Sequence, residues 1–166
     1  MVHLERPNVS QNVQTKCAAL IHMKVFVPCD AIEAHKATVA AAANGSPTYL
    51  RFGREKSSIM TTKETPFEIG KAIIFREGKD VSIIGCGILL YNSLLAAEEL
   101  AKEGIECEVI NSHTIKPFDT ETIVGSAKKT GAVVSVEEHQ VNGGLGSVIA
   151  ETLSKTSGFW ESRKCK

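Results

Sequence analysis

Titratable side chains gather in two loops of the chain, and each loop follows a predicted strand. These side chains are His113, Lys116, Asp119, Glu137, Glu138 and His139. Open α/β sheets carry their sites beyond the carboxyl ends of the strands, so the two loops are expected to lie near each other. A histidine beside a carboxylate can serve as an acid–base pair or as metal ligands. The alternative is a structural role, because Asp119 is placed to cap a helix and neighbouring acids on a loop are usually solvated.

Two arginines, Arg51 and Arg54, flank Gly53 at the end of a predicted strand. A guanidinium in that place can bind a phosphate through two parallel hydrogen bonds. The spacing alone is equally typical of a pair of surface arginines.

The turn Gly85-Cys86-Gly87 follows a predicted strand and opens a helix, as the first two glycines of a dinucleotide-binding fingerprint do. Leu90 replaces the third glycine, and Asn111 stands where an acidic residue would contact a ribose. A plain strand-to-helix turn is therefore favoured, and a small nucleotide-binding domain is kept as an alternative. The chain has no Gly-x-Ser-x-Gly motif and no P-loop lysine, so catalysis within one domain has no support.

The composition of the 166 residues is that of a globular protein, with 43% hydrophobic residues and 19 basic residues balanced by 19 acidic ones. A balanced charge disfavours nucleic acid and anionic membranes as partners. The apolar runs fall well short of the roughly 20 residues that a membrane span needs. The first ten residues lack an apolar signal region, so the cytoplasm is the expected location. Five cysteines without a Cys-x-x-Cys spacing argue against a disulfide framework and a structural zinc site.

Strands and helices alternate along the chain. The expected elements are strand 25–27, helix 31–43, extended segment 48–52, strands 69–75 and 81–84, helix 89–103, strand 105–110, helix 119–129, strand 132–136 and helix 145–153. Residues 1–22 show no clear period and are assigned no element. The turn-like residues 77–80 predict a hairpin between the strands that flank them. The alternation predicts an α/β fold with three layers, in which helices cover both faces of a mostly parallel, mixed sheet and a partial α/β unit precedes it.

Several segments closely resemble the C-terminal half of transketolase, in the same order and with the same spacing. They are VPCD at 27–30, YLRFGR at 49–54, HTIKPFD at 113–119 and VSVEEHQ at 134–140, followed by GGLG at 143–146. The resemblance covers about residues 22–154 and is strongest to the split transketolases, in which the C-terminal section is a separate polypeptide. Deoxyxylulose phosphate synthase and the β subunits of 2-oxo acid dehydrogenases share the segments like TIKP and EE more loosely.

The resemblance implies thiamine-diphosphate-dependent ketol transfer between phosphorylated sugars in the pentose phosphate pathway, with Mg²⁺ holding the diphosphate. It divides the chain into a divergent segment 1–22, the end of the pyrimidine-binding middle domain at 23–60, a linker at 61–66 and a C-terminal domain at 67–166. Arg54 matches the family arginine that binds the substrate phosphate. His113, Glu138 and His139 are kept as a possible loop site.

The chain also departs from the family pattern. It contains no Gly-Asp-Gly motif for the metal and diphosphate, and it lacks the glutamate that activates the cofactor. We therefore expect no thiamine diphosphate or Mg²⁺ on this chain alone, and activity only with an N-terminal transketolase section. A non-catalytic interaction or regulatory module with the same fold is the alternative. The chain looks truncated at both ends, which predicts an open sheet edge, an apolar face and a homo-oligomer.

Overall fold

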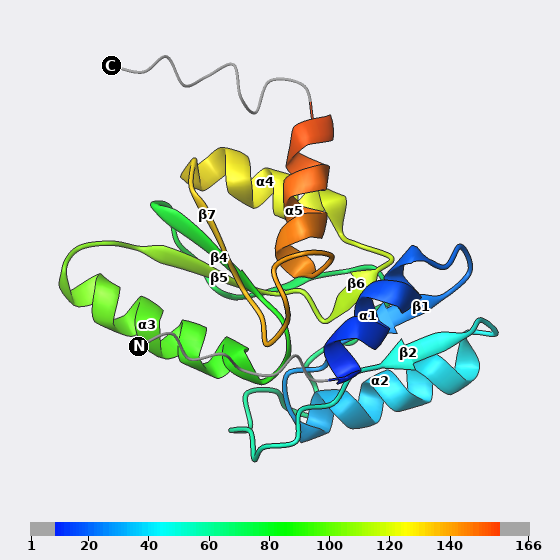
Figure 1. The fold of residues 1–166 in the computed structure, drawn as a ribbon. Helices are drawn as coiled ribbons and strands as arrows, with labels where there is room; N and C mark the ends of the chain where they lie inside the picture. The colour runs from blue at the N-terminus through cyan, green and yellow to red at the C-terminus, as the bar shows by residue number, and fades with distance from the viewer. Residues whose placement is uncertain (1–8, 157–166) are drawn as a thin grey trace, which may run out of the picture.

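The structure is a computed structural model that describes residues 9–156, with side chains from residue 13. Two sheets lie side by side, and helices cover them from both sides (Figure 1). In chain order the elements are α1 (Val9–Ala19), β1 (Lys24–Phe26), α2 (Ala31–Ala43), β2 (Thr48–Leu50), β3 (Ile73–Arg76), β4 (Val81–Gly85), η1 (Gly87–Leu89, a 3-10 turn), α3 (Leu90–Lys102), β5 (Cys107–Asn111), β6 (Thr114–Lys116), α4 (Thr120–Thr130), β7 (Val133–Val136) and α5 (Leu145–Lys155).

The larger sheet has the strand order β3-β5-β4-β7. Strand β4 runs parallel to both β5 and β7, and β3 runs antiparallel to β5. In Figure 1, α3 lies on one side of this sheet, and α4 and α5 lie on the other. The predicted α/β fold, with a mixed sheet between helices, is thereby confirmed.

The smaller sheet has the strand order β2-β1-β6. Strands β1 and β2 are parallel and are connected by α2, which is the strand-helix-strand unit that the sequence predicts. Strand β6 was expected to be part of a loop, and that expectation was wrong. It runs antiparallel to β1, where Phe26 pairs with Thr114, so a late segment of the chain completes a sheet that an early segment begins.

Helix boundaries agree closely with the prediction because side chains and glycines end the helices locally. The Asp30 carboxylate accepts a hydrogen bond of 2.8 Å from the backbone N of Glu33 at the start of α2. Asp119 caps α4 in the same way, through a bond of 3.2 Å from the backbone N of Thr122. Gly131 ends α4 with a φ of 71°, in the left-handed region that glycine adopts without strain.

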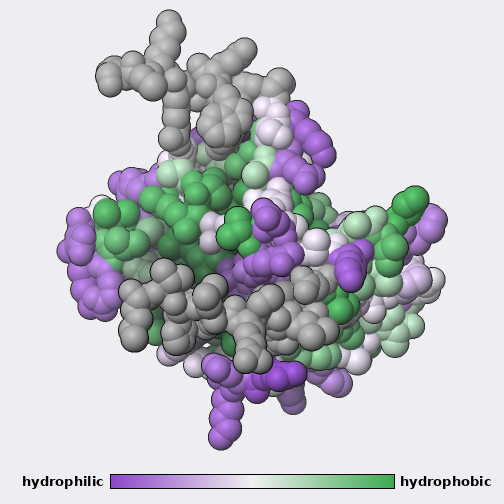
Figure 2. All heavy atoms as spheres, viewed as in Figure 1, coloured by the Kyte–Doolittle hydropathy of each residue, from purple (hydrophilic) through white to green (hydrophobic). Residues whose placement is uncertain are grey.

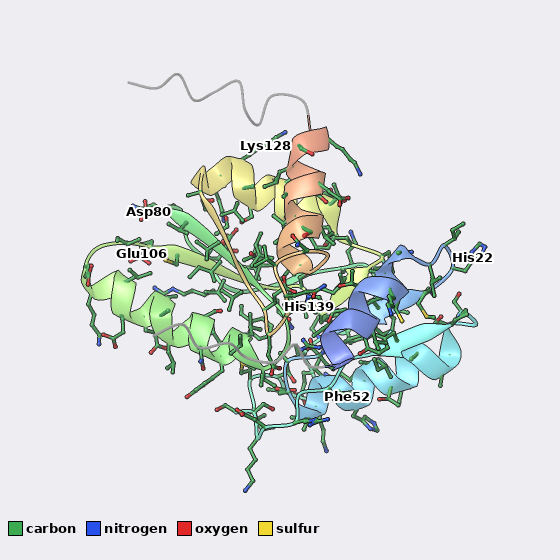
Figure 3. The ribbon with its side chains drawn as sticks, viewed as in Figure 1. His22, Phe52, Asp80, Glu106, Lys128 and His139 are labelled. Atoms are coloured by element: carbon green, nitrogen blue, oxygen red, sulfur yellow. The ribbon has the colours of Figure 1, made fainter. Side chains whose placement is uncertain are left out.

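The predicted hairpin between β3 and β4 is wrong, because β5 lies between these two strands. The turn after β3 crosses the start of β5 instead. There the backbone N atoms of Lys79 and Asp80 both donate to the carbonyl of Glu106, and the Asp80 carboxylate accepts a bond of 2.7 Å from the Glu106 N (Figure 3). Gly78 permits this crossing, since a Cβ at that position would lie 2.2 Å from the backbone carbon of Cys107.

Helix α1 lies in the segment 1–22, to which no element was assigned. That expectation was wrong for Val9–Ala19, and residues 1–8 lie outside the described residues. The helix packs the small side chains of Cys17 and Ala18 against the main core. Its other residues are largely polar, so the sequence shows no clear apolar stripe of helical period.

The core is divided between the two sides of the larger sheet. One cluster, with Ile84, Ile110, Ile123 and Leu145, lies under α4 and α5, and the second, with Leu90, lies under α3. Beside α3, an apolar trough opens over β4 and β7. Apolar side chains from three elements and the loop before β5 line it, namely Val81, Ile83, Ala96, Leu100, Ile105, Val134 and Val136. Figure 2 shows hydrophobic side chains over this part of the molecule. Within residues 9–156, no helix is long and apolar enough to cross a membrane.

Candidate functional site

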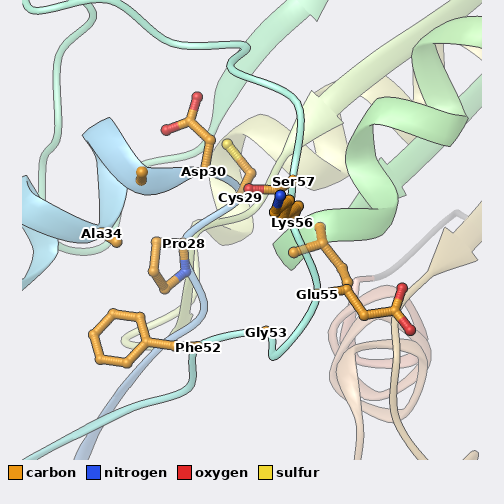
Figure 4. Close-up of a pocket in the computed structure, with 11 residues that line it drawn as sticks. Pro28, Cys29, Asp30, Ala34, Phe52, Gly53, Glu55, Lys56 and Ser57 are labelled. Atoms are coloured by element: carbon orange, nitrogen blue, oxygen red, sulfur yellow. The ribbon is translucent and has the colours of Figure 1, made fainter.

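A cavity of about 430 Å³ opens between the turn that leads from β1 into α2 and the segment that follows β2 (Figure 4). Gly53 lies against Ile88 at its edge, where a Cβ would come within 2.7 Å of the isoleucine Cγ2. The cavity is lined by residues 28–31, Ala34, Phe52, Gly53, 55–57 and Ile88. Two of these residues, Gly53 and Glu55, are the sequence neighbours of Arg54, the arginine predicted to bind phosphate.

Arg54 is exposed on the segment that borders this cavity. Its neighbours Glu55 and Lys56 line the cavity, and no hydrogen bond or ion pair within residues 9–156 engages its guanidinium. An exposed guanidinium is suited to receive a phosphate, because it offers two parallel N–H donors.

Arg51 has a different environment, since its side chain is only 8% exposed. Its guanidinium donates to the carbonyl of Glu138 and lies 3.6 Å from Oε2 of the same residue. Its backbone N donates to the carbonyl of Phe26 over 2.9 Å. The two arginines therefore have different roles. Arg51 makes contacts within the protein, whereas Arg54 is an exposed cation.

His113 is fully buried. Its Nε2 lies 3.1 Å from the carbonyl of Glu68, and its ring stacks at 4.4 Å on Phe67. Its Nδ1 lies 3.4 Å from Oε1 of Glu33, which also accepts a bond of 2.7 Å from the Asn111 amide. His113 thus belongs to a buried polar cluster below α2.

The acids and the histidine after β7 have partners of their own. Glu137 accepts a bond of 3.0 Å from the backbone N of Gly146 at the start of α5. Nδ1 of His139 lies 2.9 Å from the carbonyl of Gln140, and Figure 3 shows His139 beside the end of β7. Glu138 in turn contacts the guanidinium of Arg51.

Lys116 and Asp119 serve the fold. The Lys116 ammonium donates to the carbonyl of Ala18 over 3.0 Å and to the carbonyl of Leu20, which holds α1 beside β6. Asp119 caps α4 and also accepts a bond of 2.8 Å from the backbone N of Ala72. Burial opposes the charge of Asp119, but these hydrogen bonds outweigh it and hold the pKa of its carboxyl below the usual value.

The residues predicted from the two loops thus have different partners, with His113 beside Glu33 and Glu68 and Glu138 beside Arg51. Among residues 9–156, no group of three or more histidines, cysteines or acids is arranged to hold a metal ion. Arg54 stands between Gly53 and Glu55, which line the cavity, but it is not one of the lining residues. His113 lies beside Glu33, whereas Glu138 lies beside Arg51.

The turn Gly85-Cys86-Gly87 is filled by the protein itself. The backbone N of Cys86 donates to the carbonyl of Val136, and that of Gly87 donates to the carbonyl of Val27. The side chain of Leu90 packs against Gly85, where a Cβ would lie 3.0 Å from its Cδ1. Because these amides are engaged, they cannot cradle a pyrophosphate, which argues against the nucleotide-binding alternative.

Cys29, which lines the cavity, and Cys86 are both buried and free. Burial raises the pKa of the Cys29 thiol far above its usual value, and the nearby Glu33 and Asp30 raise it further. Burial likewise raises the pKa of the Cys86 thiol. Neither thiol is therefore a nucleophile at neutral pH.

Sequence reasoning missed the most connected side chains of this region. Asp30 was expected only to cap α2, yet its carboxylate also accepts bonds of 2.7 and 2.6 Å from the backbone N atoms of Met60 and Thr61. Glu33 was expected only to complete the cap signature, yet it lies at the centre of the buried cluster with His113. The cap signature was the only local signal for these two acids, and Thr61 gave none.

The family described as "Transketolase, C-terminal domain" matches residues 70–163. The chain is 45% identical to the 6-deoxy-6-sulfo-D-fructose transketolase subunit SqwH of Clostridium sp. (strain MSTE9), over 80% of the chain and 41% of that protein. It is 36% identical to the transketolase-like protein 1 of Bos taurus, over 82% of the chain and 23% of that protein. This chain therefore spans less than half the length of these relatives.

Solved structures of transketolases share the fold of this chain. A split-gene transketolase, described as an inactive beta4 tetramer, superposes with a TM-score of 0.86 and 40% identity, over 89% of this chain and 49% of that one. The transketolase of Campylobacter jejuni shares the fold at 21% identity and a TM-score of 0.65, over 77% of this chain and 21% of that one. The chain belongs to the transketolase C-terminal domain family.

Proposed function

We propose that this chain is the C-terminal part of a thiamine-diphosphate-dependent transketolase, which transfers a two-carbon ketol unit between phosphorylated sugars once an N-terminal section is bound. The observation that carries the proposal is the likeness to a separate transketolase subunit, at 45% identity over 80% of this chain. The division of the chain into the end of a pyrimidine-binding domain, a linker and a C-terminal domain is part of this proposal, as are the pentose phosphate pathway and a cytoplasmic location.

The residues of this chain do not fit the cofactor by themselves. No Gly-Asp-Gly motif is present in the sequence, and no set of metal-binding side chains gathers within residues 9–156. In our proposal, the N-terminal section supplies the groups that hold thiamine diphosphate and Mg²⁺. This chain supplies Arg54 for the substrate phosphate and the adjacent cavity wall.

The proposal includes assembly with further copies. The outer edge of β7 has no strand partner within residues 9–156, and Val134 on that strand is 49% exposed. Such an edge beside the apolar trough favours association. Light scattering of the purified chain should therefore show an oligomer, and a clean monomer would count against this part.

The function is tested by reconstitution with an N-terminal transketolase section that carries Gly-Asp-Gly. Ketol transfer from a ketose phosphate to an aldose phosphate should require both sections, thiamine diphosphate and Mg²⁺. Calorimetric titration of this chain alone with thiamine diphosphate and Mg²⁺ should show no binding. A stable complex of the two sections that stays inactive would favour the non-catalytic interaction module.

A further inference from the structure

The chain between β2 and β3 has the composition of a linker, yet much of it is fixed to α2. Asp30 is 4% exposed and Thr61 is 2% exposed, so their contact is buried. The Thr61 hydroxyl lies 2.8 Å from Oδ1 and 3.0 Å from Oδ2 of Asp30. The backbone N atoms of Met60 and Thr61 also donate to the Asp30 carboxylate. We call these contacts of Asp30 with Met60 and Thr61 the latch.

A second set of hydrogen bonds connects the segment between β2 and β3 to a residue further along α2. The Lys36 ammonium donates over 2.6 Å to the carbonyl of Thr62 and also to the carbonyl of Thr65. Residues 60–65 are therefore attached to α2 at both ends. A free linker would cost conformational entropy when it is ordered, whereas this segment is already held.

The latch closes a short exposed loop, residues 53–59, that carries Arg54. At its beginning, Arg51 is fixed by Phe26 and Glu138. At its end, the latch holds Met60 and Thr61. Of the loop residues, only Ser57 is partly buried, and the others are exposed. The two anchored ends therefore limit where the loop that carries Arg54 can lie.

The latch itself rests on a rigid support. The Glu33 carboxylate accepts a bond of 2.6 Å from the backbone N of Cys29, next to Asp30. Its other oxygen contacts Asn111 at the end of β5 and His113 before β6. The turn that presents Asp30 is therefore fixed to both sheets, which limits the motion of the latch.

We propose that Asp30 and Thr61 are positioning residues for substrate phosphate, because their latch holds the end of the loop that carries Arg54 and borders the cavity. The inference rests on the proposed function, in which Arg54 binds a phosphorylated sugar. A binding group gains from a fixed place because the ordering cost is met during folding and not at each binding event.

The matched test uses Thr61→Ala with Thr62→Ala as the control. Thr62 is exposed and its hydroxyl bonds only within residues 62–65, so both variants remove one hydroxyl from adjacent positions. Thr61→Ser keeps the hydroxyl and should behave as the parent chain. If Thr61→Ala fails to fold, the Thr61→Ser variant and the amide exchange of Met60 in the parent chain still report on the latch.

The first readout uses this chain alone and limited digestion with trypsin. Cleavage after Arg54 and Lys56 depends on local opening of the loop, so Thr61→Ala should speed it about fivefold to tenfold, and Thr62→Ala should leave it unchanged. Equal rates in all the variants, or rapid exchange of the Met60 amide in the parent chain, would overturn the latch.

The second readout uses the enzyme reconstituted with the N-terminal section. Thr61→Ala should raise the KM for an aldose phosphate about fivefold to tenfold, with little change in kcat and none in the KM for the unphosphorylated aldose. An equal rise for both sugars would overturn the positioning role. If no reconstituted enzyme is active, the proposed function fails, and the digestion result still decides whether the latch exists.

Discussion

The guanidinium of Arg51 lies 3.6 Å from the carboxylate of Glu138 and donates to its carbonyl, so the end of β2 is tied to the loop after β7. The arginine is almost fully buried, whereas the glutamate side chain is half exposed. The two halves of the contact therefore have different strengths. The charged donor on the carbonyl is the stronger part, and the exposed carboxylate adds little.

Arg51→Met should lower the free energy of unfolding by about 1.5–3 kcal/mol, because a hydrogen bond from a charged donor is lost. Glu138→Gln should cost less than about 1 kcal/mol, since solvent screens its half-exposed carboxylate and its carbonyl remains. Urea unfolding of both variants provides the comparison. Equal losses would mean that the carboxylate, and not the carbonyl, is the main partner of Arg51.

Arg54→Ala should raise the KM for phosphorylated sugars in the reconstituted enzyme. The loss of a charged contact to phosphate costs about 1.5–3 kcal/mol, which corresponds to roughly 10- to 150-fold. Steady-state kinetics with phosphorylated and unphosphorylated acceptors test this. Lys63→Ala is the control, because Lys63 is exposed and lies beyond the latch. An unchanged KM in Arg54→Ala would remove the phosphate assignment.

Acid should weaken the fold through Asp30 and Asp119. Burial opposes the charge of Asp30, but hydrogen bonds from Glu33, Met60 and Thr61 outweigh it, so the pKa of this carboxyl is lowered, as is that of Asp119. The stabilisation is complete above the ordinary aspartate pKa of 3.8 and is lost as the pH falls through the lower folded-state pKa.

Urea unfolding between neutral pH and about pH 2 measures this dependence. Asp30→Asn and Asp119→Asn should each lose stability at neutral pH and show a flatter decline in acid than the parent chain. A variant whose stability falls as steeply as that of the parent would show that its aspartate does not contribute to the acid dependence.

Lys129 should contribute more to the free energy of unfolding than its neighbour Lys128. Its ammonium contacts the buried Glu108 and lies 3.0 Å from Glu77, and the hydrogen bond to Glu108 is the main cause that raises its pKa. Lys129→Met would leave the Glu108 carboxylate buried without a cation. The expected loss is about 2–3 kcal/mol, below the roughly 3–5 kcal/mol of a fully buried pair, because Lys129 is 41% exposed.

The exposed Lys128 at the end of α4 (Figure 3) provides the control. Lys128→Met should change the unfolding free energy by less than about 0.5 kcal/mol. In a second comparison, Glu108→Leu added to Lys129→Met should recover most of the loss, because no buried charge remains. Thermal or urea unfolding of these variants would contradict the prediction if Lys129→Met were neutral.

Local signals explain which elements could be predicted. Asp30 and Asp119 bond to the third residue of the helix that each one caps, and Gly131 ends its helix alone, so a few neighbouring residues determine these boundaries. The pairing of strands depends on distant residues. The polar turn before β4 looks like that of a hairpin, but its amides bond to Glu106, which is far along the chain.

In the candidate site, too, local features could be predicted and contacts between distant residues could not. Arg54 could be named because a family motif carries it, and its sequence neighbours Gly53 and Glu55 line a cavity. The buried environment of His113 could not be predicted, since its partners Glu33 and Glu68 are far from it along the chain. Thr61 lies in a polar segment with no period, and only its contact with Asp30 distinguishes it.

The pairing of β1 with β6 also determines the order in which the fold can form during synthesis. Strands β1 and β2 leave the ribosome early, but β6 follows β3, β4 and β5 along the chain. One edge of β1 therefore stays unpaired while β3, β4 and β5 of the larger sheet are synthesised. Unpaired strand edges are prone to aggregation. A nascent chain of this protein is most exposed to misassembly in the interval between the release of β2 and the arrival of β6.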